Sequence, residues 1–157
     1  MKKPSKKSKR KPKSTAKIID DCAVLMQKLV RLKAADHNGY CKCITCGKVQ
    51  HWTVMHGAHY IERGKTATKV MEQNIHPSCQ YCNMIGDKHI REIKDAYSKY
   101  MRDRYGDSFV DELFRKSKEV KKYGIVEARS LYADLKNQVK EAEQRVEQLR
   151  PTQEDGY

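Results

Sequence analysis

The sequence predicts an α+β fold in which a small core rich in cysteine and histidine lies between an N-terminal helix and a helical C-terminal region. Apolar residues recur at helical spacing before residue 37, cysteines and histidines gather between residues 41 and 83, and helical spacing returns after residue 87. Apolar positions three and four apart mark one face of a helix. At 157 residues the chain fits one ordinary domain with appendages.

The chain begins with a strongly basic stretch. Residues 1–17 contain nine lysines or arginines and no acid, in a chain whose net charge is +13. Such a run cannot bury enough apolar surface to offset ordering, so we expect a disordered tail over residues 1–15. It contacts a polyanion such as nucleic acid, or else only keeps the chain soluble. The predicted DNA contacts in the tail are Lys2, Lys3, Lys6, Lys7, Lys9, Arg10, Lys11 and Lys13.

The first predicted helix covers about residues 16–36. Ser14 and Thr15 precede it as candidate caps, and Gly39 follows it. Its apolar face contains Cys22, which we expect to be a core thiol rather than a metal ligand. The residues of this face are Ile18, Cys22, Leu25, Met26, Leu29 and Leu32.

Three more helices are predicted at about 87–105, 108–122 and 126–149. The last has a narrow apolar seam, which suits either a helical hairpin within the chain or a coiled-coil homodimer. The seam consists of Leu131, Leu135, Val139, Ala142, Val146 and Leu149. The expected organisation is therefore the basic tail, a first helix plus core over 16–105, a C-terminal helical region over 106–150, and a polar tail over 151–157.

Two Cys-x-x-Cys units, CITC at 43–46 and CQYC at 79–82, predict a structural zinc site. Each unit presents two thiolates from one turn, and four thiolates close a tetrahedral site. The sequence has no membrane span and no signal peptide, which favours metal over disulfides and a cytosolic location. The expected ligands are Cys43, Cys46, Cys79 and Cys82, with Cys41 as the spare or as a replacement for Cys43.

The 32 residues between the two units exceed the loop of a simple zinc ribbon. The stretches VQHWTV and HGAHYI within them are typical of short strands. Zinc would pin both ends of this insert, which would bring His59 close to Asn74 and to Asn83. These three residues are therefore expected to form one pocket from distant parts of the sequence.

The order His59, Asn74, Asn83, interleaved with the cysteine units, resembles the HNH motif of the ββα-metal nuclease superfamily. More narrowly, CKCITCGK, GAHYIERG and QNIHPSCQYCN between helices are similar to the phage NinG (Rap) family, over roughly residues 17–125. The resemblance implies a zinc-stabilised HNH core. It also implies a metal-dependent endonuclease that cuts branched DNA, such as Holliday junctions or D-loops, in phage recombination in the host cytoplasm.

The resemblance also implies roles for single residues. His59 would be the general base, and Asn83 would bind a catalytic Mg²⁺ or Mn²⁺ ion through its carbonyl oxygen. Asn74 would orient His59 or tie down the loop. Many HNH enzymes carry a metal ligand just before the base, where this chain has Ala58. Either the metal relies on Asn83, waters and the cleaved phosphate, or a neighbour replaces that ligand, with His56, His76 and Glu62 as the candidates.

Two further questions stay open at this point. The cations Arg63, Lys65 and Lys69 are interpreted as phosphate contacts, although they also suit a solvated face.

Ala58 supports an alternative function, a zinc module without catalysis that binds DNA and recruits partners. A third hypothesis is an HNH nuclease that acts on linear duplex DNA.

Overall fold

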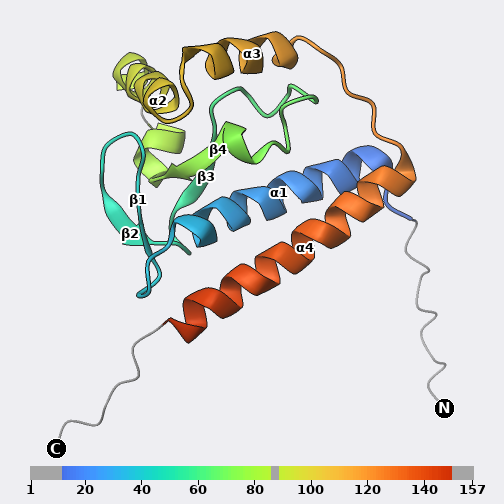
Figure 1. Cartoon of the computed structure of the whole chain (residues 1–157), viewed down its shortest axis with the longest axis horizontal. Coiled ribbons are helices and arrows are strands. Elements are labelled where there is room, and N and C mark those ends of the chain that lie inside the picture. The colour runs from blue at the N-terminus through green and yellow to red at the C-terminus, as the bar shows by residue number, and fades with distance from the viewer. Residues whose placement is uncertain (1–11, 86–88, 150–157) are drawn as a thin grey trace, which may run out of the picture.

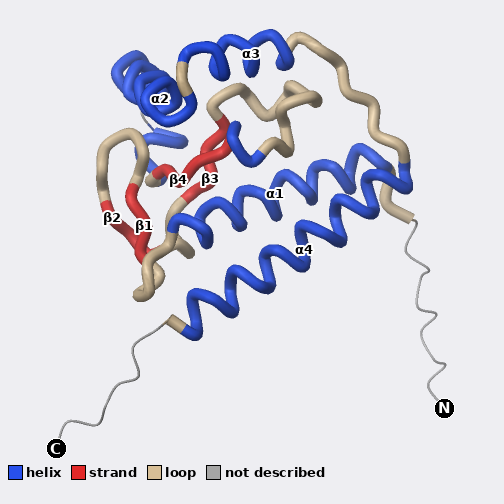
Figure 2. Tube along the Cα trace, in the orientation of Figure 1, coloured by secondary structure: helices blue, strands red, loops and turns tan. Residues whose placement is uncertain are grey.

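The computed structural model describes residues 12–85 and 89–149, and Figures 1 and 2 show how their elements are arranged. The predictions for Lys2 to Lys11 and for the polar tail lie outside these residues. In chain order the elements are α1 (Thr15–Ala34), β1 (Tyr40–Lys42), β2 (Val49–His51), β3 (His56–His59), η1 (Glu72–Asn74), β4 (Ile75–Ser78), η2 (Tyr81–Ile85), α2 (Ile90–Tyr105), α3 (Asp107–Ser117) and α4 (Ile125–Gln148). The α+β class is confirmed.

Helix α1 forms where the apolar spacing predicted it. Its N-cap is Ser14, whose Oγ accepts a hydrogen bond from the Lys17 backbone N–H at 3.3 Å. The helix ends at Ala34, close to the predicted end. Its buried face includes Leu29 and Leu32, both without exposed surface.

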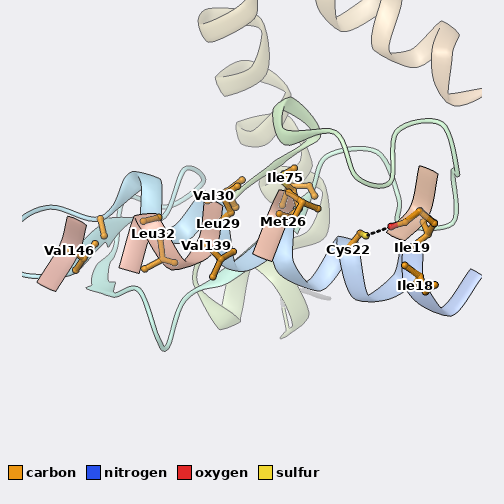
Figure 3. Close-up of a cluster of buried hydrophobic side chains, with 14 residues drawn as sticks. Ile18, Ile19, Cys22, Met26, Leu29, Val30, Leu32, Ile75, Val139 and Val146 are labelled. Carbon is orange, nitrogen blue, oxygen red and sulfur yellow. Dashed lines mark hydrogen bonds between the residues drawn. The ribbon is translucent and has the colours of Figure 1, made fainter. Parts of the chain in front are cut away.

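Helix α4 lies alongside α1 and runs parallel to it, as Figure 1 shows. At the start of the pair the Cys22 thiol lies 4.0 Å from the Ala128 carbonyl oxygen, and at its end Arg145 donates to the Leu32 carbonyl oxygen at 2.5 Å. Figure 3 shows Cys22 and the apolar side chains of both helices pointing into one cluster. Cys22 is therefore a core thiol, as predicted.

The predicted seam of α4 is used inside the chain. Leu135 and Val139 are buried in the cluster with α1, and Leu149 at the seam's end is about half exposed. The seam packs within the chain, which was one of the two predicted alternatives, but on the parallel helix α1 and not in a hairpin. A homodimer through another surface of the C-terminal helices stays a prediction.

The structure has two short antiparallel ribbons; that of β3 and β4 lies between α1 and α2, and that of β1 and β2 lies beside the C-terminal end of α1 (Figure 2). Strand β1 pairs with β2, and β3 pairs with β4, so that Ala58 lies opposite His76. Both predicted strands exist but are shorter than VQHWTV and HGAHYI. Strand β3 packs directly on α1, because a Cβ at Gly57 would lie 2.7 Å from the Gln27 Cα. Glycine at this position permits that close approach.

Helices α2 and α3 cover the other side of β3 and β4 and form a second cluster around Met101 and Leu113. The predicted helix over 108–122 was too long, since α3 ends at Ser117. Val120 is 77% exposed and belongs to the connection that leads to α4. Its spacing continues the pattern of α3, yet it has no core to pack against.

Among residues 12–85 and 89–149, every helix is too short or too polar to span a bilayer.

Candidate functional site

The four predicted cysteines come together. The Sγ atoms of Cys43, Cys46, Cys79 and Cys82 all lie within 4.8 Å of one another, and those of Cys46 and Cys79 are 3.7 Å apart. A tetrahedral zinc ion with Zn–S bonds of about 2.3 Å separates its sulfur atoms by about 3.8 Å. The residues therefore fit a structural zinc ion. Cys41 is buried beside this group but is not part of it, as predicted for the spare cysteine.

Two backbone turns shape this tetrathiol site. The Gly47 N–H donates to the Cys43 carbonyl oxygen at 3.0 Å, and the Asn83 N–H donates to the Cys79 carbonyl oxygen at 3.0 Å. Gly47 has a φ of 76°, a left-handed conformation that favours glycine. Each Cys-x-x-Cys unit therefore closes a turn that points both of its thiols the same way.

The pKa values of two of these thiols shift in opposite directions. Burial raises the pKa of Cys43, but backbone N–H groups of Cys46, Cys79 and Thr45 outweigh it and lower this pKa to about 6. Burial and neighbouring thiols raise the pKa of Cys82 far above its ordinary value. One sulfur is thus prepared as a thiolate, while a cation must offset the repulsion before all four ionise.

His59 lies at the end of β3 and is partly buried. Its Nε2 lies 2.9 Å from the Lys69 carbonyl oxygen, so Nε2 carries the proton and Nδ1 keeps a free lone pair. Burial lowers the pKa of His59 from its ordinary value of 6.5, and the charges of Arg63 and Lys69 act in the same direction. The ring is therefore neutral at pH 7 and able to accept a proton at Nδ1.

Asn74 is fully buried and ties down the loop after β3. Its Oδ1 accepts from the Ile61 N–H at 2.8 Å, and its Nδ2 donates to the carbonyl oxygens of Ile61 at 3.0 Å and Thr68 at 3.1 Å. Thr68 precedes Lys69, whose carbonyl oxygen holds His59. Of the two predicted roles for Asn74, tying down the loop is the direct one, and orienting His59 follows from it through the backbone.

Asn83 adjoins His56. The Asn83 Nδ2 lies 3.0 Å from the His56 Nδ1, and both residues line a small cavity beside α1. Turning the carboxamide over exchanges Nδ2 and Oδ1, which would point an amide oxygen and an imidazole nitrogen at one cation. The other two candidates to replace the ligand missing at Ala58 do not line a cavity with Asn83. Glu62 pairs with Lys65, and His76 is hydrogen-bonded to two tyrosines.

His59 and Asn83 share a second cavity of about 370 Å³, as expected, but the expected third member, Asn74, is fully buried under the loop and lines neither cavity. Ala58 also lines it but offers no ligand atom, and Lys94 of α2 supplies a cation at its wall. The remaining walls are largely apolar, with Ile93 and Phe114 among them. Asn83 therefore stands between the cavity of His56 and the cavity of His59.

Several positioning residues were missed by the sequence analysis. Arg31 of α1 donates to the carbonyl oxygens of Trp52 at 3.2 Å and Met55 at 2.7 Å, and so holds the chain just before His56. The Tyr97 hydroxyl donates to the Ala58 carbonyl oxygen at 2.8 Å. Arg31 falls on the polar side of the first helix, next to Gln27 and away from Leu29, so the helical spacing gave no signal of this role.

His76 hydrogen-bonds to the Tyr97 hydroxyl. Its Nδ1 lies 3.2 Å from the Tyr97 hydroxyl and its Nε2 lies 3.0 Å from the Tyr105 hydroxyl. Because the Tyr97 hydroxyl donates to Ala58, His76 carries its proton on Nδ1 and accepts at Nε2. Burial lowers the pKa of His76 to about 4, with the Arg104 charge acting in the same direction. His76 is a neutral structural residue.

The predicted phosphate contacts have partners within the chain. Lys69 forms an ion pair with Asp20 at 2.5 Å, Arg63 donates to the Asp20 carbonyl oxygen at 3.2 Å, and Lys65 lies 3.4 Å from Glu62. Lys13 pairs with Asp21 at 2.6 Å. These exposed pairs are weak enough to exchange for phosphate, except that Lys69 is largely buried.

A comparison with protein families matches residues 1–147 to the family described as "Bacteriophage Lambda NinG protein". This match spans most of the 157 residues. The comparison with curated proteins found no match, and neither did the comparison with solved structures.

Proposed function

The chain belongs to the phage NinG family, and we propose that it is a metal-dependent endonuclease of the HNH type that cleaves branched DNA. Membership implies a role related to phage recombination, where Holliday junctions and D-loops are the branched substrates. One observation carries the proposal: His59 and Asn83 line the same cavity, although 24 positions separate them in the sequence. The order of β3, β4 and the short helix with Asn83 agrees with a ββα core.

His59 is the general base of the proposed reaction. Its Nδ1 takes a proton from the water that attacks the phosphorus atom, and the Lys69 carbonyl oxygen holds the ring through Nε2. The same carbonyl stabilises the imidazolium that results, since Nε2–H becomes a stronger donor when the ring is charged. Asn74 keeps this carbonyl in place through its bonds to the loop.

His56 and Asn83 would hold a divalent ion at the edge of this cavity. When bound, it stabilises the negative charge that develops on the phosphate and on the leaving 3′ oxygen. The donor set of one imidazole nitrogen and one amide oxygen suits Mn²⁺ better than Mg²⁺, which prefers oxygen ligands throughout. His56 thus supplies the metal ligand that Ala58 cannot, because the methyl group of Ala58 has no ligand atom.

The substrate contacts come from cations around the cavity and from the tail. Lys94 lines the His59 cavity and is the nearest candidate for a phosphate next to the cleaved bond. The basic tail adds contacts that do not depend on sequence. The preference for branched over linear DNA rests on the family alone.

A second candidate function is a zinc module that binds DNA without cutting it. Two observations favour it: Ala58 stands at a ligand position, and the only cluster of three or more candidate metal ligands in the described residues is the tetrathiol site. Such a module would use the basic surface and recruit partners through its helices. It predicts binding of branched DNA with no strand breaks.

Nicking of a labelled four-way junction tests the proposal. We expect the full-length protein to nick it with Mn²⁺, more slowly with Mg²⁺, and to cut a linear duplex of the same sequence more slowly than the junction. His56→Ala should raise the Mn²⁺ concentration needed for half-maximal rate, because it removes one of two protein ligands. Glu62→Ala is the matched control, because Glu62 pairs with Lys65 instead.

Each outcome separates the hypotheses. Binding without nicking at any Mn²⁺ concentration favours the zinc module. Equal rates on junction and duplex favour a nuclease for linear DNA. An unchanged Mn²⁺ requirement in His56→Ala contradicts the proposed ligand while leaving the nuclease intact.

A further inference from the structure

A cavity of about 670 Å³ lies on the other side of the tetrathiol site from the His59 cavity: Cys43 and Cys46 line the former and Cys82 lines the latter. Helix α1, the turn after β1, strand β4 and the end of α2 contribute to its walls. Thr45 is the one residue that lines both this cavity and the His59 cavity. Neither the proposed catalytic residues nor the predicted DNA contacts lie in it.

The cavity has an excess of positive charge. The only carboxylate that lines the cavity is that of Glu72, and it pairs with Lys33 at 2.7 Å. Lys42 and Arg104 are exposed, and neither has a carboxylate partner within 4.0 Å among residues 12–85 and 89–149. Lys42 also adjoins the turn of the tetrathiol site, since its Cε lies 3.2 Å from the Cβ position of Gly47. Arg104 is therefore the clearer mark of an anionic ligand.

The Tyr105 ring holds the Arg104 side chain in place. Its guanidinium lies 5.4 Å from the centroid of the Tyr105 ring, and the Tyr105 hydroxyl donates to His76 at 3.0 Å. The guanidinium also hydrogen-bonds to the Tyr105 side chain, which fixes its orientation, and a pair of its remaining N–H donors can face a ligand. Phosphate oxygens accept such a pair.

The two cavities are too far apart to hold the same phosphate group. Both lie along α2, with Lys94 in the wall of one and Arg104 in the wall of the other. Ten residues of helix correspond to about 15 Å along its axis. A phosphate at Arg104 is therefore not the phosphate cleaved at His59.

We propose that this cavity is a second phosphodiester-binding site, which holds the DNA backbone away from the cleaved bond through Arg104 and Lys42. The inference rests on DNA as the substrate of the proposed function. It adds an anchor on the face of the molecule that the motif residues do not reach. A bound duplex would then lie across the tetrathiol site, from the His59 cavity to the end of α2.

Junction binding over a range of salt concentrations tests this anchor. The variants are Arg104→Gln, Lys42→Gln and their combination. The control is Lys136→Gln with Lys140→Gln, which removes two exposed charges from α4. We expect the combination to weaken binding about tenfold and to lower the slope of log K against log salt by about two, since each lost phosphate contact removes about one. The control should keep affinity and slope.

Nicking by saturating protein distinguishes an anchor from a catalytic group. We expect the combination to nick the bound junction at the wild-type rate. Unchanged affinity and slope in a protein that still nicks DNA would overturn the anchor and leave the nuclease standing. A lost nicking rate at saturation would place the two cations in catalysis and also overturn it. A wild-type protein that binds no DNA would remove both the anchor and the proposed function.

Discussion

The helix pair α1 and α4 and the segment from Tyr40 to Asn83 are held together by different forces. The pair buries leucine, isoleucine and valine side chains along its whole length, as Figure 3 shows. The segment has two short ribbons, and its links are thiols, a buried asparagine and hydrogen bonds from Arg31 and Tyr97.

This difference assigns separate tasks to the two regions. Apolar packing is non-directional, so the pair provides a stable platform without fixing single atoms. Hydrogen bonds and metal ligands are directional, so the segment can fix His56, His59 and Asn83 relative to one another. The proposed chemistry therefore depends on the region that has the least apolar core of its own.

Removal of zinc should separate the two regions most strongly. Chelation or Cys79→Ser should unfold the segment, because structural zinc sites supply on the order of 10 kcal/mol of folding free energy. Amide hydrogen exchange should show lost protection in β3 and β4 and retained protection in α1 and α4. Cys41→Ser should keep one zinc ion per chain, since Cys41 lies outside the tetrathiol site. An unchanged melting temperature after complete removal would argue against the site.

Truncation in the helix pair should destabilise the platform instead. Leu135→Ala should lower the free energy of unfolding by about 2–5 kcal/mol, because the side chain is 1% exposed and leaves a cavity. Leu149→Ala, at a side chain that is 49% exposed, should change it by about 0.5 kcal/mol or less. Urea denaturation measures both. Equal effects would mean that the seam does not hold the platform.

Acid should weaken the segment through His76. Its pKa is about 4 in the folded chain, against an ordinary value of 6.5, so the unfolded chain binds the proton first. Stability is then fully present above pH 6.5 and falls by up to about 3 kcal/mol as the pH drops towards 4. Unfolding experiments across this range measure the loss. His76→Gln, which has no titrating ring, should lose less, and an identical pH profile would exclude His76 as the cause.

The contact between the two regions should be sensitive at Gly57. Gly57→Ala pushes β3 off α1, because the new methyl group would lie 2.7 Å from the Gln27 Cα, and should cost about 1–3 kcal/mol. Gly64→Ala is the control, since no atom lies within 4 Å of the corresponding position. If both variants unfold at the same denaturant concentration, β3 does not need this close approach.

Sequence patterns predicted the helices and the four cysteines well, for a physical reason. Apolar spacing in α1 and α4 reflects local geometry, and the spacing of Cys43 and Cys46 reflects a single turn. The same patterns did not reveal that α4 packs on α1 in parallel, because partner choice depends on residues far apart in sequence. They also extended α3 to about residue 122, because the apolar spacing continues at Val120, which has no core to pack against.

The sequence predicted that His59 and Asn83 lie close together, but it did not predict that Asn74 lies outside their cavity or which hydrogen bonds hold the site. His59, Asn74 and Asn83 follow from motif order, and the zinc prediction follows from Cys-x-x-Cys spacing. The roles of Arg31, Tyr97 and His76 depend on hydrogen bonds across the fold, which no local pattern encodes. Asn74 was given two roles, and only the three-dimensional contacts rank them.

The rate of junction nicking by His59→Ala, compared with His51→Ala under single-turnover conditions, tests the proposed role of the segment most directly. His51 contacts Thr53 and lies outside both cavities of the proposed site. We expect a rate about 10²–10⁴ times lower for His59→Ala, with zinc content unchanged, and a wild-type rate for His51→Ala. Nicking by His59→Ala at the wild-type rate would contradict it.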